Sequence, residues 1–552
     1  MSAATPTTTR RLPLAGVLRL GRPSDIWFKP AFSVVAAVAP PNLALLALGR
    51  LDLAMYTMAG SLCALYGHNR PYLARARTLA WVILGMVGGL AVALTAASLT
   101  TNAAVLVTVG ALMAAVQKVL CDATRVGPPG NVVLTFISSA SLFAPQTFSQ
   151  VPGHLGLALA AGAWAWLVGM APGLLRPHGP ERRATAHALN ATAAHADTRG
   201  TGDGRDRTRA AAAAAVQTAW QSLLATGART DRTRRALEHL VVRAEVALAA
   251  PADADPALLR GWARALRGTG RVPRVAGADD DLLGVDAERA VPQRPLWRRL
   301  GPLAPLAART ALGCALAGYV SLALGVGRPY WALVTAASLY QANVTLTWSR
   351  GVQRVVGNLL GVLVFAAVVP LAHLHPAALV LCCLAFNFGA EALIGRNYWL
   401  GSVCVTPMAL LVTEFARTQD AGQLITERVV DTVVGALVGF ATAVVVTNRR
   451  AGDRIEHALT AVERAREQAA RLLTDPQPAP RALEAARRTL SAALADLRAT
   501  ADAASGEWWQ RALPQERVVL AEQSGHRTLA ATVRRQGAHS WGGARTTEDV
   551  RP

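Results

Sequence analysis

Charged residues are scarce in this sequence, and their scarcity excludes most classes of soluble protein. Only 16% of the 552 residues are Asp, Glu, Lys or Arg, against roughly 25% in an average soluble protein. Lysine is almost absent, with Lys29 and Lys118 alone. The charges avoid two long blocks, 31–175 and 301–447, almost completely. A soluble core does not leave such runs at regular intervals, so the composition predicts a polytopic membrane protein.

The sequence also lacks the motifs of metal sites and of common enzymes. Its six cysteines form no CxxC pair and mostly lie in or beside apolar segments, which predicts buried thiols. His373 and His375 supply only two potential metal ligands. Neither a P-loop nor a Ser/His/Asp constellation is present. We therefore predict no metal, no cofactor and no enzymatic activity, and an ATP-driven pump would need its motor on another chain.

Acidic residues are few relative to arginine, and the formal net charge is +21. Such an excess can indicate nucleic-acid binding. Aromatic residues make up only 5% of the chain, however, and no basic stretch carries interleaved aromatics. The arginines instead gather in loops that a membrane topology places on one side. We expect a lipid bilayer, and no nucleic acid, as the partner.

What the sequence does have is room for six membrane spans in each block, at about 20 residues per span. The predicted spans are 31–49, 51–67, 78–99, 103–120, 131–148 and 154–175, then 303–325, 330–347, 354–372, 376–394, 398–416 and 428–447. Pro40 and Pro41 are expected to break the first span. Pro145 and Pro407 lie in the fifth and eleventh. Broken spans are tolerated where they line a cavity or are covered by neighbours.

Loop arginines predict the orientation of the spans. The loops assigned to the inside carry Arg70, Arg75, Arg77, Lys118, Arg125, Arg350, Arg354 and Arg396. Outer loops near 100–102, 150–153 and 373–376 have no Lys or Arg. Four arginines fall on the outer side, namely Arg50, Arg328, Arg417 and Arg428. The excess of Lys and Arg in the loops assigned to the inside predicts a multi-pass protein of the cell membrane with both termini in the cytoplasm.

The blocks divide the chain into six predicted parts. These are a cytoplasmic N-terminus (1–30), a first transmembrane repeat (31–175), a cytoplasmic helical region (176–300), a second transmembrane repeat (301–447), a second cytoplasmic helical region (448–536) and a disordered tail (537–552). Apolar residues at helical spacing predict one long helix over 210–250. A helical hairpin is predicted over 454–473 and 481–504.

The two blocks share short phrases at a constant separation. Ala59-Gly-Ser-Leu aligns with Ala336-Ala-Ser-Leu, and Arg77 aligns with Arg354, both 277 positions apart. Equal numbers of spans give both halves the same orientation, so the repeat is parallel with its axis along the membrane normal. The predicted fold is an all-α polytopic membrane protein with two parallel six-span repeats and cytoplasmic helical hairpins.

Four phrases in the second block carry a family resemblance. They are RPYWALVTAA from Arg328, RGVQRVVGNLLG from Arg350, RNYWLGSVCVTP from Arg396 and ERVVDTVVG from Glu427. In this order, each beside a predicted span, they resemble the fusaric-acid-resistance (FUSC) family, which includes aromatic-acid exporters and is similar to aluminium-activated malate transporters. The first half resembles the family mainly by layout, since GPPGN from Gly127 replaces the RNYW phrase.

The resemblance implies efflux of small organic anions, often aromatic carboxylates. Family members in two-membrane bacteria work with a periplasmic adaptor, and a homo-oligomer such as a dimer remains open. Proton coupling would need titrating groups at membrane depth, where a charge costs about 2.5–3.5 kcal/mol. The candidates are Glu391 near the inner end of the tenth span, Glu414 near the outer end of the eleventh and Asp431 near the outer start of the twelfth. The alternative is that these carboxylates are simply solvated at an interface.

Candidates for contact with an anionic substrate are three arginines and two asparagines, Arg309, Arg354, Arg428, Asn343 and Asn387. An arginine offers a planar fork that matches a carboxylate. Each has an ordinary alternative: positive-inside bias for Arg354, a local pair with Asp431 for Arg428, and helix–helix contacts for the asparagines.

Three functions therefore compete. The first is a proton-coupled exporter of organic anions, and the second is a passive organic-anion channel, which needs no titrating group. The third is a membrane scaffold whose cytoplasmic helices bind a partner.

Overall fold

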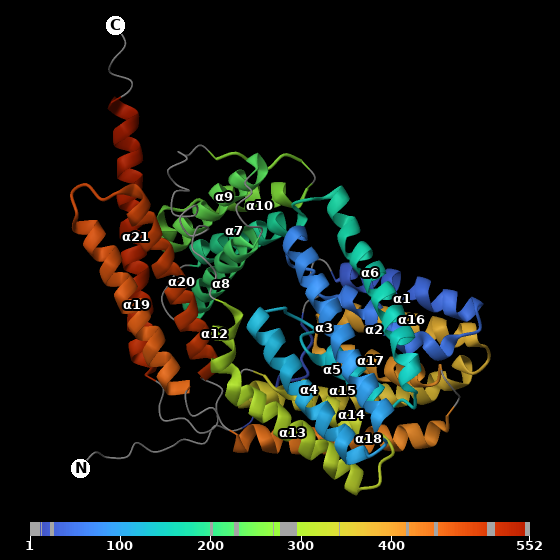
Figure 1. Cartoon of the computed structure of the whole chain (residues 1–552). Helices are drawn as coiled ribbons and strands as arrows, with labels where there is room; N and C mark the ends of the chain where they lie inside the picture. The colour runs from blue at the N-terminus through green and yellow to red at the C-terminus, as the bar shows by residue number, and fades with distance from the viewer. Residues whose placement is uncertain are drawn as a thin grey trace, which may run out of the picture.

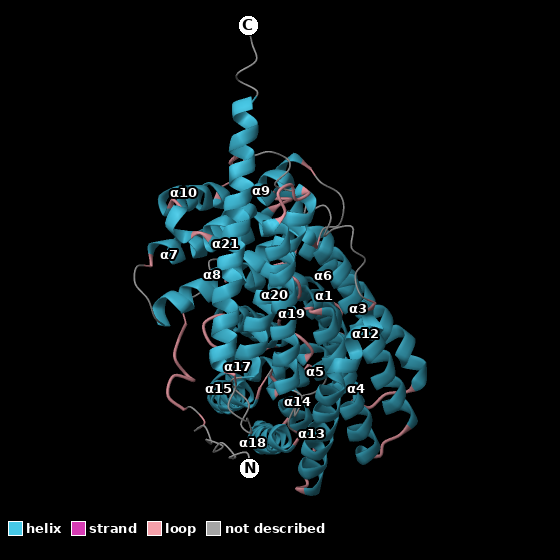
Figure 2. Cartoon of the chain, turned by 90° about the vertical axis from the view of Figure 1, so that its left-hand side faces the viewer, coloured by secondary structure: helices cyan, strands magenta, loops and turns pink. Residues whose placement is uncertain are grey.

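The structure is a computed structural model. It describes residues 12, 14–21, 27–198, 203–225, 231–268, 270–275, 295–341, 343–415, 419–446, 451–504 and 514–546. Every regular element within these ranges is a helix, so the all-helical part of the predicted fold is confirmed (Figure 2). The helices form an apolar body, made of α1–α6 and α13–α18, and a polar body, made of α7–α10 and α19–α21 (Figure 1).

The apolar body contains a helix at each of the twelve predicted spans. The first half comprises α1 (Phe28–Ala47), η1–α2–η2 (Leu51–Leu65), α3 (Tyr72–Leu99), α4 (Ala103–Thr124), α5 (Val132–Leu142), η3 (Phe148–Gln150) and α6 (Val151–Leu175). The second half comprises α13 (Ala304–Ala323), α14 (Tyr330–Leu339), α15 (Val344–Ala372), α16 (Pro376–Ile394), α17 (Tyr398–Thr413) and α18 (Ala421–Val445). By length and composition eight of the described helices could cross a membrane, and the second and fifth of each half are shorter.

Two boundary predictions in the apolar body were wrong. Pro40 and Pro41 lie inside α1 without ending it, because packing against neighbouring helices can hold a helix across the backbone bonds that proline removes. The eighth span ends at Leu339 and the ninth begins at Val344. The Asn343 side chain caps α15 by accepting from the Leu346 N–H at 2.8 Å, which fixes that start earlier than hydropathy alone indicates.

Corresponding helices of the two halves pack in corresponding ways. The first helix of each half crosses to the fourth helix of the other, α1 on α16 and α13 on α4. Within the halves α2 packs on α6 as α14 packs on α18. A Cβ at Gly60 would lie 2.1 Å from the Ala158 carbonyl oxygen, and one at Gly435 would lie 2.5 Å from that of Ala332. The parallel six-span repeat accounts for this pattern and stays a prediction.

The polar body joins the two regions that the sequence predicts outside the membrane. Its helices are α7 (Gly179–Asp197), α8 (Asp203–Leu224), α9 (Arg232–Ala249), α10 (Pro256–Arg267), α19 (Ala451–Thr474), α20 (Pro480–Ala504) and α21 (Gln515–Thr546), and the short α12 (Leu296–Leu300) precedes α13. The regions are joined by an Arg209–Glu522 ion pair at 3.4 Å and by Arg488, which lies 3.9 Å over the Trp220 ring.

The polar body corrects two sequence predictions and agrees with a third. The long helix predicted over 210–250 is two helices, α8 and α9, and residues 226–230 between them lie outside the described residues. The predicted disordered tail from 537 overlaps α21, which continues to Thr546, and 547–552 are not among the described residues. Helices α19 and α20 match the predicted hairpin.

Candidate functional site

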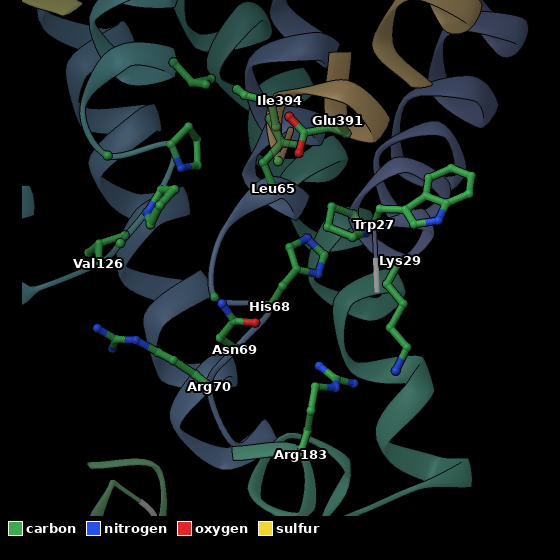
Figure 3. Close-up of a pocket in the computed structure, with 18 of the residues that line it drawn as sticks. Trp27, Lys29, Leu65, His68, Asn69, Arg70, Val126, Arg183, Glu391 and Ile394 are labelled. Carbon is green, nitrogen blue, oxygen red and sulfur yellow. The ribbon is translucent and has the colours of Figure 1, made fainter. Parts of the chain in front are cut away.

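A cavity of about 2410 Å³ extends from the polar body into the apolar body. Its outer part is lined by α7, α9 and α10, and its inner part by the ends of α14–α18. Figure 3 shows a part of the wall, with Arg183 and Arg70 at one end of the view, His68 between them and Glu391, and Ile394 beside Glu391. The cavity therefore joins the arginine-rich helices to the region of the predicted spans.

The lining of the cavity is strongly positive. Fourteen of the lining residues are Arg or Lys, and only Asp122 and Glu391 are acidic. The basic residues are Lys29, Arg70, Lys118, Arg125, Arg176, Arg182, Arg183, Arg232, Arg267, Arg271, Arg274, Arg350, Arg354 and Arg428. A concave surface with one sign of charge concentrates ions of the opposite sign, so this cavity attracts anions.

Some of these arginines have structural partners. Arg182 donates to the backbone carbonyls of Leu266, at 3.2 Å, and Gly270, at 2.9 Å, where α10 ends. Burial lowers the pKa of the Arg182 guanidinium below its usual value. Its hydrogen bonds hold α10 against α7, so Arg182 shapes the wall as well as charging it.

The inner end of the cavity holds a guanidinium that the protein leaves largely unpaired. Arg428 of α18 is 1% exposed, and its Cζ lies 4.0 Å from the centre of the Trp331 ring of α14. Its Nε and Nη1 have no hydrogen-bond partner among the described residues. A buried cation without an anionic partner is costly, and an anion in the cavity would balance the charge of Arg428.

Two further arginines lie at this end, both around Tyr398 of α17. Arg354 Nη1 donates to the Tyr398 hydroxyl at 2.7 Å, and Arg350 Cζ lies 3.2 Å from the ring centre. The Nε atoms of both arginines are buried, with no hydrogen bond to any described residue. One turn after Arg354, Gly357 lets α15 and α17 cross closely, since a Cβ there would lie 2.5 Å from Ser402 Cβ. That crossing brings Tyr398 against the arginines.

Aromatic rings close the inner end of the cavity between the halves. Phe136 of α5 stacks on Trp331 at 5.3 Å between ring centroids, and both line the cavity. Phe143 stacks on Tyr330 at 5.7 Å, and neither of these two lines it. The Phe136–Trp331 stack therefore forms part of the cavity wall, and the Phe143–Tyr330 stack lies outside the lining.

Four of the residues predicted from the sequence line this cavity: Glu391, Asn387, Arg354 and Arg428. Asn387 lies one turn before Glu391 on α16, and its side-chain amide donates to the Cys383 carbonyl at 2.9 Å. Glu391 is partly exposed to the cavity (Figure 3). The structure thus brings three of the predicted substrate-contact residues and one of the predicted proton-coupling residues to the same cavity.

The other four predicted residues are not among those that line the cavity. Asp431 is 0% exposed and accepts from the Ser321 hydroxyl at 2.5 Å. Glu414 Oε2 accepts a hydrogen bond from His373 Nε2 at 3.0 Å. Arg309 donates to the Val446 carbonyl, at 2.7 Å from Nη2, and Asn343 caps α15.

The local pair predicted between Arg428 and Asp431 is not formed. In the described structure Arg428 faces the Trp331 ring and Asp431 bonds Ser321 of α13. Both partners come from other helices, so spacing along α18 did not reveal them. Sequence reasoning likewise missed Trp331, Tyr398 and Arg350 as site residues, although the YW and NYW phrases placed aromatic residues at the ends of two short spans.

Comparison with known proteins finds a family match within the second half. Residues 315–442 match the family described as fusaric acid resistance protein-like, which confirms the resemblance of the phrases between Arg328 and Gly435. The chain is also 25% identical over 480 residues to "Uncharacterized membrane protein YvaC" of Bacillus subtilis (strain 168), covering 78% of this chain and 74% of that protein. No solved structure gives a significant match.

Proposed function

We propose that this membrane protein, whose second half is fusaric acid resistance protein-like, exports small organic anions from the cytoplasm. The observation that carries the proposal is the cavity lined by fourteen basic residues, which ends at the buried and partly unpaired guanidinium of Arg428. An anion would enter between α7, α9 and α10 and move toward the inner arginines. The aromatic carboxylate type of substrate follows from the family resemblance.

The direction of export depends on the predicted topology, with the polar body in the cytoplasm. The cavity is then open to the inside and closed toward the outside by the stacks of Phe136 on Trp331 and Phe143 on Tyr330. Alternating access would require α5 and α14 to separate while the polar side of the cavity closes.

Proton coupling is proposed for Glu391, with Asp431 as a second group. Glu391 lies at the cavity wall, where its carboxylate can exchange a proton with the cavity through which the anion passes. Asp431 Oδ2 is buried with no hydrogen bond to the described residues, so it is placed to hold a proton. Both carboxylates belong to helices of the second half.

Efflux measurements test this function. Proteoliposomes loaded with a panel of aromatic acids are assayed with and without a proton gradient. We expect gradient-dependent efflux of organic anions. Equal efflux in both conditions supports the passive channel, and no efflux supports the scaffold.

The Glu391→Gln variant tests the coupling group. Glutamine keeps the shape and hydrogen-bonding capacity of glutamate but cannot titrate, so gradient-driven efflux should be lost while the protein still folds. Asp122→Asn is the matched control, because Asp122 is the other acidic residue of the lining. Asp122 is exposed and pairs with Lys118 at 3.2 Å. Normal gradient-driven efflux by Glu391→Gln would exclude the proposed role.

A further inference from the structure

We infer that the inner end of the cavity, at Arg350, Arg354 and Arg428, is a binding site for an anion that carries at least two negative charges. The inference rests on the proposed function and specifies the charge of its substrate. A site for a singly charged aromatic acid would need one cation and a free ring face. The observed arrangement offers three cations and two rings that cations already contact.

The number of unpaired donors is the first argument. Each of the three guanidinium groups has at least one buried N–H without a hydrogen-bond partner in the part of the chain that the structure describes. The buried Arg428 and Arg354 are 1% and 4% exposed. Removing a charged donor from water without a partner is costly. One carboxylate cannot satisfy three cations, and a second negative charge would balance a second guanidinium.

The negative charges nearby do not neutralise this cluster. Glu391 lines the same cavity, but no ion pair joins it to the three arginines within the described ranges. Asp431, on the same helix as Arg428, bonds Ser321 and forms no ion pair with Arg428 in the described structure. Its single charge acts on Arg428 from a distance, which leaves three cations facing one carboxylate. Tyr398 accepts one hydrogen bond from Arg354, which leaves the positive charge in place. The cluster therefore keeps an excess of positive charge for a ligand.

The aromatic residues position the cations more than they offer a stacking surface. Arg350 lies over Tyr398 and Arg428 lies over Trp331, and Trp331 also stacks on Phe136. Such contacts fix the planes of the guanidinium forks. A guanidinium group held in a fixed plane binds a carboxylate through two parallel N–H donors. Recognition by charge and fork geometry then dominates over recognition of an aromatic ring.

Four probes separate the effect of charge from the effect of the ring. Benzoate and butyrate carry one negative charge, and phthalate and succinate carry two at about pH 7.5. One member of each pair has a ring. Efflux from proteoliposomes is compared at equal concentration. We expect the efflux of each dicarboxylate to be about tenfold faster than that of its monocarboxylate partner. One further charge-assisted hydrogen bond gives a factor of about this size. Benzoate moving as well as phthalate would overturn the inference.

A binding measurement keeps the inference separate from the proposed function. The thermal shift of the purified protein in detergent is recorded with the same four probes. Stabilisation by phthalate and succinate without efflux supports the dianion site and contradicts the exporter. Efflux of monoanions alone supports the exporter and contradicts the dianion site. Equal shifts with all four probes also contradict it.

Charge-removing variants locate the site. Arg350→Gln and Arg354→Gln should each reduce the preference for dianions about tenfold, since each removes one charged fork. Arg77→Gln is the control, because Arg77 is exposed and is not among the residues that line the cavity. Two variants are used so that a folding defect in one does not decide the result. Monodisperse elution from a size-exclusion column checks that each variant is folded. An unchanged preference in both folded variants would refute the assignment.

Discussion

Burial decides which ion pairs of this protein matter. Arg328, just before α14, and Glu427, near the start of α18, meet at 2.8 Å, and their side chains are 21% and 10% exposed. Gln423 also donates to Glu427, at 2.8 Å. Arg50 and Asp52 form a pair of similar length, 3.1 Å, with side chains 57% and 46% exposed. Solvent screens the second pair far more than the first.

Neutralising the two carboxylates should therefore have unequal effects. Glu427→Gln leaves Arg328 without its charged partner in a largely buried place, and we expect a loss of stability of about 1–3 kcal/mol. Asp52→Asn should change stability little. Thermal unfolding in detergent measures both, and equal melting temperatures for the two variants would show that burial does not govern these pairs.

A histidine in the polar body gives the stability of that body a dependence on pH. Burial, followed by the charges of the neighbouring Arg209 and His195, lowers the pKa of His526 to about 4. The unfolded chain has a histidine pKa of about 6.5, so below this pH the unfolded state binds more protons. Stability is therefore present above about pH 6.5 and is lost as the pH falls toward 4, by roughly 2–3 kcal/mol in all.

Melting curves between pH 7 and pH 5 test this dependence. The melting temperature of the protein should fall over this interval, and the fall should be smaller in His526→Gln, which cannot titrate. Burial raises the pKa of Glu522 on the same helix, which acts on the pH dependence with the opposite sign, so the comparison with His526→Gln isolates the share of the histidine. The same fall in the variant and in the parent protein would assign the dependence to other groups.

At the scale of the helices, glycines decide which crossings are close. A Cβ at Gly357 of α15 would lie 2.5 Å from Ser402 Cβ and 2.6 Å from the Trp399 carbonyl oxygen. On α3, the corresponding long helix of the first half, a Cβ at Gly85 would meet nothing within 4 Å. The same residue type therefore serves a tight crossing in one helix and an open face in the other.

Substituting alanine at both glycines separates these roles. Gly357→Ala should destabilise the protein by about 1–3 kcal/mol, because the carbonyl of α17 cannot move away without breaking helix packing. It should also weaken anion binding, since Tyr398 on α17 shifts away from Arg354. Gly85→Ala should be neutral or slightly stabilising. Thermal unfolding measures the difference, and a stable Gly357→Ala protein would mean that the crossing can widen freely.

At the scale of the whole molecule, the cavity has a transport role only if the polar body lies in the cytoplasm. A reporter fused after Gly200, a position outside the described residues, or after Pro552 should give a cytoplasmic signal, since both adjoin arginine-rich segments. A reporter inserted near Gln150 should give an external signal. An external signal from either of the first two fusions would reverse the direction of the proposed export.

Charge distribution and hydropathy in the sequence were enough to predict the membrane class, the all-helical fold and the positions of the twelve apolar helices. These properties are local, because each span must satisfy its own backbone hydrogen bonds and hide its own apolar surface. The family phrases contain Arg354 and Arg428, and the cost of a charge at membrane depth indicated Glu391, one turn after Asn387; all four residues line one cavity. Hydropathy did not distinguish the four short helices from the long ones, because caps such as Asn397, which begins the short α17, set helix ends.

Only the tertiary structure decided which charged groups meet a ligand space. Arg428 and Asp431 are three residues apart on α18, yet one lies over Trp331 at the cavity and the other bonds Ser321 away from it. Their partners come from α14 and α13, more than 90 residues earlier in the chain. A buried charge takes the nearest partner that folding brings to it. Spacing within one helix fixes the face on which a charged residue lies, and the packing of other helices fixes what that face meets.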